Sequence, residues 1–135
     1  MVYSIEEIEG IGKVYEEKLN ACGIKSTDHL LDKCASKSGR KAISEESGID
    51  AKKLLTFANH ADLMRISGVA GQFAEWLEAA GVDTVKELRN RNAANLAEAM
   101  KKHNDEKKLT KGLLSESKVQ GWIDQAKEME PKVTH

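Results

Sequence analysis

The sequence contains very little proline, cysteine or aromatic side chain. Among 135 residues there are one proline, two cysteines and 4% aromatic residues. Cys22 and Cys34 form no C-x-x-C pair, which argues against a disulfide framework and favours reduced thiols packed in a core. A core built without aromatics must use Leu, Ile, Val and Ala, and this composition favours helices over sheets. We therefore predict an all-α fold.

Long apolar runs are also missing. None approaches the ~18 residues that a membrane-spanning helix needs. The N-terminus has no basic segment followed by an apolar one, as a secretory signal would have. We expect a cytoplasmic protein that has no membrane partner.

Motifs for metal binding and catalysis are not found. The four histidines are His29, His60, His103 and His135, and none has a second ligand at metal-binding spacing. No glycine-rich turn is followed by Lys-Ser or Lys-Thr, as in a nucleotide-binding loop. The glutamates are spread over predicted helix faces. We expect no metal, no cofactor, no small-molecule substrate and no enzymatic activity.

What the sequence does contain is an internal repeat. Residues 8–30 align without gaps with residues 66–88, at an offset of 58. Further along, an offset of 68 aligns Leu54 with Trp122, so the second copy carries about ten extra residues between Asn92 and Gly112. Such repetition indicates two related structural units. We predict a single domain over residues 1–135, with repeat one at about 4–63 and repeat two at about 64–130.

Each copy reads as a series of helices. Apolar residues recur at helical spacing in residues 13–22 and 71–80, and Gly23 and Gly81 follow where a left-handed residue would end each helix. The expected starts of other helices are Ser4 with Glu7, Ser26 or Thr27, Asp50, and Thr84 with Glu87. The helix after Asp50 has an apolar stripe of Leu54, Ala58, Ala61 and Met64 and a polar face of Lys52, Lys53, Asn59 and Asp62. It should bridge the two copies.

The last helix carries Trp122 and ends near Pro131. Trp122 and Trp76 both lie on apolar stripes. Core packing is one interpretation of the two tryptophans, and a partner interface is the other.

Gly10 and Gly12 lie one residue apart between two helical patterns. We expect both glycines to supply backbone angles that side chains resist, with Ile11 between them pointing inwards and Val69 doing the same in copy two. The amides that begin the next helix then point outwards at the positive end of its dipole. Such a turn can bind an anion, typically a phosphate oxygen.

These residues resemble the helix-hairpin-helix motif, in which an apolar residue and a spacer precede Gly-Ile-Gly and a helix with a late Leu. Two such motifs joined by a helix resemble the tandem form of many DNA repair and replication proteins. The whole chain, from "IEGIGKVYEEKLNACGI" to "VQGWIDQAKEM", resembles a bacterial domain-of-unknown-function family built on paired helix-hairpin-helix repeats. The resemblance implies two helix-hairpin-helix repeats and a bridging helix in one compact all-α domain.

The resemblance also implies contact with the DNA or RNA backbone, independent of base sequence. By position, the donors would be the amides around Gly10, Gly12 and Lys13 in copy one and around Gly68, Ala70 and Gly71 in copy two. The sequence departs from the motif at Ala70, which replaces the second glycine and should give a looser turn. It also departs at Gly71 and Gln72, where no basic residue follows, and at Glu16, where the motif commonly has a small residue.

Charge around the turns opposes phosphate binding. Residues 6–18 hold two lysines and five glutamates, a balance of −3, and the whole chain has a net charge of −1. A more basic segment contains Lys101, Lys102, Lys107, Lys108 and Lys111. It is either a solvated helix end or a strip that contacts phosphates.

Two functions therefore remain open. The first is a weak nucleic-acid-binding module that uses the turn at residues 10–13 and perhaps the basic segment. The second is a protein-interaction module that has kept the architecture and lost phosphate binding. The acidic surroundings of the turn favour the second, and its glycine-rich backbone favours the first.

Overall fold

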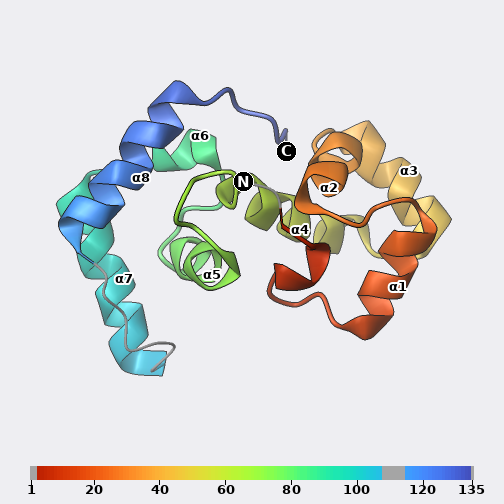
Figure 1. The fold of residues 1–135 in the computed structure, drawn as a ribbon, viewed down its shortest axis with the longest axis horizontal. Coiled ribbons are helices and arrows are strands. Elements are labelled where there is room, and N and C mark those ends of the chain that lie inside the picture. Colours follow the sequence, from red (N-terminus) through yellow and green to blue (C-terminus); the bar gives the residue numbers. More distant parts are fainter. Residues whose placement is uncertain (1–2, 108–114, 135) are drawn as a thin grey trace.

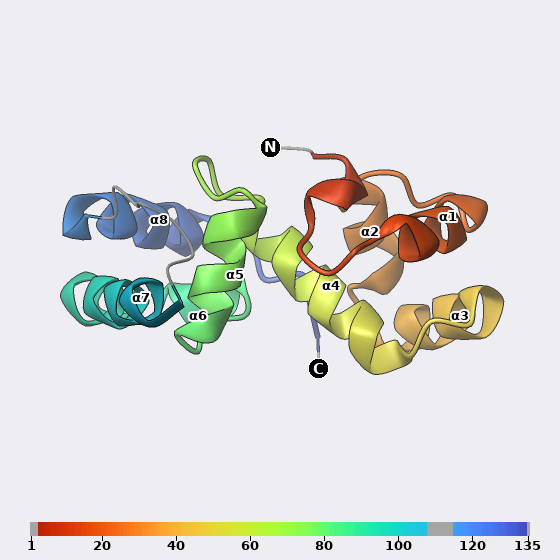
Figure 2. The same cartoon turned by 90° about the horizontal axis from the view of Figure 1, so that it is seen from below.

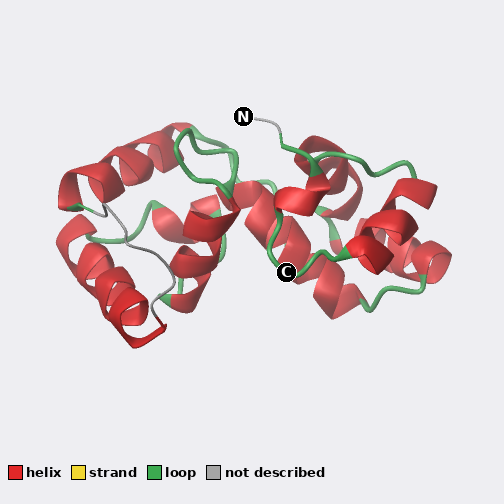
Figure 3. Cartoon of the chain, turned by 60° about the horizontal axis from the view of Figure 1, so that its bottom comes forward, coloured by secondary structure: helices red, strands yellow, loops and turns green. Residues whose placement is uncertain are grey.

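The computed structural model describes residues 3–107 and 115–134, with the backbone alone at residues 103–107. Within them, every regular element is a helix (Figure 3), which confirms the predicted all-α class. The elements are η1 (Ile5–Glu7), α1 (Lys13–Ala21), α2 (Thr27–Cys34), α3 (Lys37–Ser47), α4 (Ala51–Leu63), α5 (Gly71–Ala79), α6 (Val85–Leu88), α7 (Ala93–Lys107) and α8 (Glu116–Glu128). In the described part of the chain, no helix has both the length and the apolar character to cross a membrane.

Helix α4 lies between two groups of helices (Figure 2). Helices α1, α2 and α3 lie on one side of it, and α5, α6, α7 and α8 lie on the other. Both α2 and α5 pack directly on α4, whereas α6 and α7 pack on α8. The helix that begins after Asp50 therefore belongs to the packing of both halves.

Most of the predicted helix ends agree with the structure. The side chains of Ser26, Asp50 and Thr84 each accept a hydrogen bond from a backbone amide at the start of a helix. Gly23 and Gly81 end their helices with φ angles of 80° and 95°. These are left-handed conformations that glycine adopts at little cost.

A short helix begins after Ser4 as predicted, but no capping box forms at Ser4. Its side chain accepts no capping hydrogen bond, and the element that follows is only the three-residue 3-10 helix η1. The backbone of Ser4 instead forms an isolated bridge with Ser26, next to a hydrogen bond of 2.8 Å from the Thr27 amide to the Tyr3 carbonyl. Pairing with the start of α2 holds this segment extended.

The polar face predicted for α4 is also partly wrong. Asn59 and Asp62 are buried, as are all residues from 57 to 63. Because α4 is covered from both halves, it has little surface left for solvent. Trp76 and Trp122 are buried as well, which confirms that they belong to the core and not to an exposed interface.

After α8 the chain returns to the first half (Figure 1). The Thr134 amide donates to the Ala35 carbonyl at 2.9 Å, and Arg40 Nη2 donates to the Thr134 carbonyl at 2.6 Å. Val133 is buried beside them. The C-terminal segment therefore joins the last helix to α2 and α3.

Candidate nucleic-acid interface

The turns before α1 and α5 have the same hydrogen-bonded backbone. In the first turn the Ile11 amide donates to the Ile8 carbonyl at 3.1 Å. In the second turn the Val69 amide donates to the Ile66 carbonyl, also at 3.1 Å. Ile11 and Val69 are buried, as predicted. The local conformation therefore recurs after 58 residues.

Only the first glycine position in each turn requires glycine. Gly10 and Gly68 have φ angles of 93° and 94°, which L side chains rarely adopt. Gly12 has φ −87° and ψ −176°, and Ala70 has almost the same values, −97° and −177°. Because any residue adopts this extended conformation, two expectations are wrong. Gly12 is not needed for its backbone angles, and Ala70 does not loosen the second turn.

An aromatic ring supports each left-handed glycine. Phe57 of α4 lies under the first turn, 3.6 Å from where a Cβ of the glycine would be, and packs edge-on against Tyr15 of α1 with ring centroids 5.6 Å apart. Trp122 of α8 lies under the second turn, with its Nε1 3.3 Å from the equivalent position. Its ring lies 5.1 Å from the Phe73 ring of α5. The two turns are therefore supported alike.

The helices that follow the turns begin without a side-chain cap. Neither Gly12 before α1 nor Ala70 before α5 provides a capping hydrogen bond. Each of the other α-helices has a cap: Ser26 for α2, Ser36 for α3, Asp50 for α4, Thr84 for α6, Asn92 for α7 and Ser115 for α8. The first amides of an uncapped helix need acceptors and carry the positive end of its dipole.

The first turn is open to solvent. Gly10, Gly12 and Lys13 are all exposed, and a Cβ on Gly12 would meet no atom within 4 Å. Val14 follows with 64% exposure, the only large hydrophobic side chain in the described residues that is exposed. A partner that approaches this turn can therefore reach the backbone of Gly12 and the side chains after it.

The charges around the first turn are mostly negative. Of the acidic side chains predicted to oppose an anion, Glu6, Glu7, Glu9 and Glu17 are exposed and Glu16 is half-buried, against exposed Lys13 and Lys18. No salt bridge within the described residues neutralises this group. Its carboxylates remain free to repel a phosphate at low ionic strength.

The second turn is held by α8. The Ser67 amide donates to Gln125 Oε1 at 3.0 Å, and Gln125 Nε2 donates to the Ser67 carbonyl at 3.2 Å. Gly68 is itself exposed, but the Trp122 ring lies against it. This turn therefore already has a partner within the chain.

The start of α5 is covered by the first half. Gly71 is buried, and a Cβ there would lie 2.0 Å from the Glu7 carbonyl oxygen. Ala70 is half-buried. We expected amides around Gly71 to face outwards, but the structure places this residue against the backbone of η1.

The predicted basic segment lies far from the first turn. Lys101 and Lys102 are exposed on α7, which lies at one end of the molecule, while α1 lies at the other (Figure 2). The side chain of Lys107 is not among the described parts of the chain. Lys108 and Lys111 lie wholly outside the described residues. The structure does not bring Lys101 and Lys102 together with the first turn.

A polar network that includes the buried Asp62 and His60 connects α4 with the second half, and it was not predicted from the sequence. Asp62 accepts hydrogen bonds from Arg65 Nη1 at 2.7 Å and from the Val85 amide, at the start of α6, at 2.8 Å. His60 is buried and hydrogen-bonded to Glu78 of α5, and this bond lowers the pKa of Glu78 against the opposing effect of partial burial. The contacts of Asp62 with Val85 and of His60 with Glu78 join separate helices, so no local motif predicts them. In the described residues, no three His, Cys, Asp or Glu side chains gather as a metal site would require.

Comparison with known proteins gives a family match. Residues 9–129 match the family model described as "Domain of unknown function (DUF4332)". No curated protein and no solved structure matches the chain. The match covers both turns and all the α-helices, and its description assigns no activity.

Proposed function

This chain belongs to the DUF4332 family of domains of unknown function, and we propose that it is a non-catalytic module of the tandem helix-hairpin-helix type. In this proposal it binds the sugar-phosphate backbone of DNA or RNA weakly and without sequence preference. The first turn, from Gly10 to Val14, makes the contact.

The uncapped start of α1 is the observation that supports the proposal. No hydrogen bond from the described residues engages the amides of Gly12, Lys13 or Val14. Gly12 leaves the approach free, since nothing lies within 4 Å of its missing Cβ. A phosphate oxygen there would accept from amides at the positive end of the helix dipole, with the Lys13 ammonium beside it.

The second turn has a structural role in this proposal. The Ser67 amide already donates a hydrogen bond to Gln125, and the Glu7 carbonyl lies against Gly71. Binding through one turn and one lysine, close to five glutamates, must be weak. We expect a dissociation constant of about 10⁻⁴ to 10⁻⁵ M at low salt that becomes weaker as salt rises.

A titration of labelled duplex and single-stranded DNA tests the proposal. Fluorescence anisotropy at about 0.01 M and about 0.15 M salt gives the affinity and its salt dependence. Lys13→Glu should abolish binding. Lys86→Glu, at an exposed position of α6, makes the same change of charge away from the turn and should weaken binding only slightly.

An NMR titration identifies the surface. Addition of DNA should shift the amide signals of Gly12, Lys13 and Val14 first. Absence of binding at about 10⁻⁴ M in low salt would contradict the proposal, as would equal effects of the two charge reversals.

Val14 favours a second candidate, a protein-interaction module. A single large apolar side chain, 64% exposed and beside free amides, suits a protein partner as well as a nucleic acid. A partner of this kind would be retained after nuclease treatment and lost on Val14→Ser. Loss of all captured partners on nuclease treatment would instead favour nucleic acid.

A further inference from the structure

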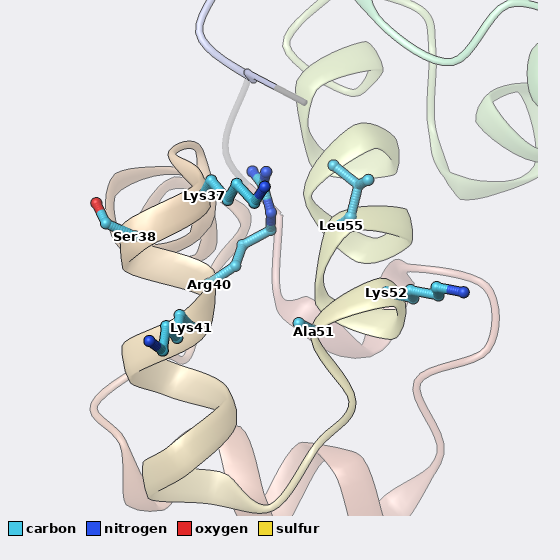
Figure 4. Close-up of a pocket in the computed structure, with 7 residues that line it drawn as sticks. All are labelled: Lys37, Ser38, Arg40, Lys41, Ala51, Lys52 and Leu55. Carbon is cyan, nitrogen blue, oxygen red and sulfur yellow. The ribbon is translucent and has the colours of Figure 1, made fainter.

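A cleft of about 640 Å³ lies between α3 and α4 (Figure 4). Its lining residues are Lys37, Ser38, Arg40 and Lys41 of α3 and Ala51, Lys52 and Leu55 of α4. The volume lies within the range of small-molecule sites. None of these residues takes part in the turn before α1.

The α4 wall of the cleft is apolar. Ala51 faces the gap, and Leu55 lies higher on the same wall (Figure 4). Lys41 and Lys52 turn their amines outwards, away from the gap, so that their aliphatic stems border it. Such walls suit the hydrocarbon part of a ligand.

Arg40 places a buried positive charge at one end of this cleft. The residue is only 4% exposed. Its Nη1 donates to the carbonyls of Cys34 and Ala35 at 3.0 and 2.9 Å, and its Nη2 donates to Thr134 at 2.6 Å. A guanidinium has five N–H donors, so Nε and one N–H of Nη2 have no hydrogen bond to the described residues.

No carboxylate in the described part of the chain pairs with Arg40. Buried charges in proteins are normally paired with an opposite charge. Burial also lowers the pKa of this guanidinium, because desolvation disfavours its charged form. Three backbone carbonyls therefore solvate this positive charge, but no carboxylate within the described residues neutralises it.

Lys37 adds a second cation at the same place. Its side chain extends from α3 toward the gap in the view of Figure 4, and Lys37 lines the same cleft as Arg40. Lys37 is exposed and forms no salt bridge with the described residues. Two cations without a carboxylate partner in the described residues thus line the same cleft as the apolar wall.

We propose that the cleft between α3 and α4 binds a small amphiphilic carboxylate. The carboxylate would accept from Lys37 and from the spare donors of Arg40, whose planar fork suits two oxygens. The hydrocarbon part would lie against Ala51 and Leu55. This site is separate from the proposed nucleic-acid contact, so either can fail alone.

Octanoate is a suitable probe, with octanol and octylammonium as probes that lack the negative charge. An NMR titration of the full chain should shift the amide signals of residues 37–41 and 51–55, with a dissociation constant below about 1 mM for octanoate. Octanol should bind at least about tenfold more weakly and octylammonium should not bind. Equal binding of octanol, or no octanoate binding at about 1 mM, would overturn the proposal.

Variants locate the site. Lys37→Glu should weaken octanoate binding about tenfold or more, since it replaces an attractive charge with a repulsive one. Lys53→Glu makes the same change on α4 at an exposed residue outside the lining and should leave the affinity within about twofold. Leu55→Asp should abolish binding by placing a carboxylate on the apolar wall.

Two controls accompany these variants. The circular dichroism spectrum of each variant must match that of the parent chain, and Lys37→Glu is expected to fold because Lys37 is exposed. Binding to anionic lipid vesicles without binding to free octanoate would indicate attraction to a charged surface and would overturn the cleft proposal.

Discussion

The first and second turns share a backbone conformation but have opposite surroundings. Gly10 and Gly68 have φ angles within a degree of each other, and each lies over an aromatic ring. Yet the first turn leads into exposed Lys13, whereas the second leads into buried Gly71. Local hydrogen bonding therefore sets the shape of the turn, and packing with other segments decides whether the turn is available to a partner.

Two residue differences between the repeats account for the different surroundings of the two turns. At the offset of 68, Gln125 of α8 corresponds to Phe57 of α4. The amide of Gln125 binds the backbone of the second turn, whereas Phe57 has no polar group to do so. At the offset of 58, Gly71 corresponds to Lys13, and only glycine leaves room for the Glu7 carbonyl.

Gly71→Ala should have the largest effect on stability. The new Cβ would lie 2.0 Å from the Glu7 carbonyl oxygen, so the backbone of η1 or α5 must move. We expect a loss of about 3 kcal/mol in the free energy of unfolding, at the upper end for overpacking. Urea denaturation followed by circular dichroism measures it.

Gly12→Ala is the matched variant in the first turn. Its Cβ would meet nothing within 4 Å, and Ala70 already adopts this conformation in the second turn. The free energy of unfolding should stay within about 1 kcal/mol of the parent value. Similar losses for the two variants would refute the proposed difference in packing.

Gln125→Ala should have an intermediate effect. It removes two hydrogen bonds to the Ser67 backbone, and we expect the unfolding free energy to fall by about 1 to 2 kcal/mol. Gln120→Ala, on the same helix, removes only an exposed contact with Asp124 and should cost about 0.5 kcal/mol or less. Thermal denaturation of both variants measures the difference. If Gln125→Ala cost no more than Gln120→Ala, the second turn would not depend on α8.

The smallest expected effect concerns acid stability. Glu78 of α5 pairs with His60 of α4. The residue that corresponds to Glu78 in the first half is Asn20. The hydrogen bond lowers the pKa of Glu78 below its ordinary value of 4.5. The stabilisation of the folded state by ionised Glu78 is therefore present above that pH. It is lost as the pH falls through the lower value of the folded state.

Glu78→Gln should therefore lower stability slightly near neutral pH and reduce the part of the stability loss that occurs below about pH 4.5. Unfolding free energies measured from pH 7 to pH 3 check this. Glu98→Gln, at an exposed position on α7, should leave the pH dependence unchanged. A profile for Glu78→Gln that superimposes on that of the parent chain would show that the pair contributes nothing.

Helix ends could be predicted because they depend on residues close together in the chain. Asp50 and Thr84 cap the helices that follow them, and Gly23 and Gly81 adopt the left-handed angles expected at helix ends. At Ser4 a short helix begins as predicted, but the predicted capping box does not form, and the Ser4 backbone instead forms a bridge with the distant Ser26. Helix α3 was not predicted at all, since its polar sequence has few apolar residues.

The candidate site could be predicted only in part. The glycine pattern located both turns, and Gly10 and Lys13 are exposed as expected. Burial of Gly71 could not be foreseen, because it depends on the Glu7 carbonyl, which lies 64 residues earlier. Burial of Arg40 could not be foreseen either, because the C-terminal segment that covers it returns from Thr134.

The sequence alone therefore determined the helical class, the paired turns and the positions of left-handed glycine, because these follow from composition and from neighbouring residues. Only the tertiary structure decided which turn is open, which charges are buried and where a cleft forms. Those properties arise when segments far apart in the chain exclude solvent from one another, and no local pattern records that contact.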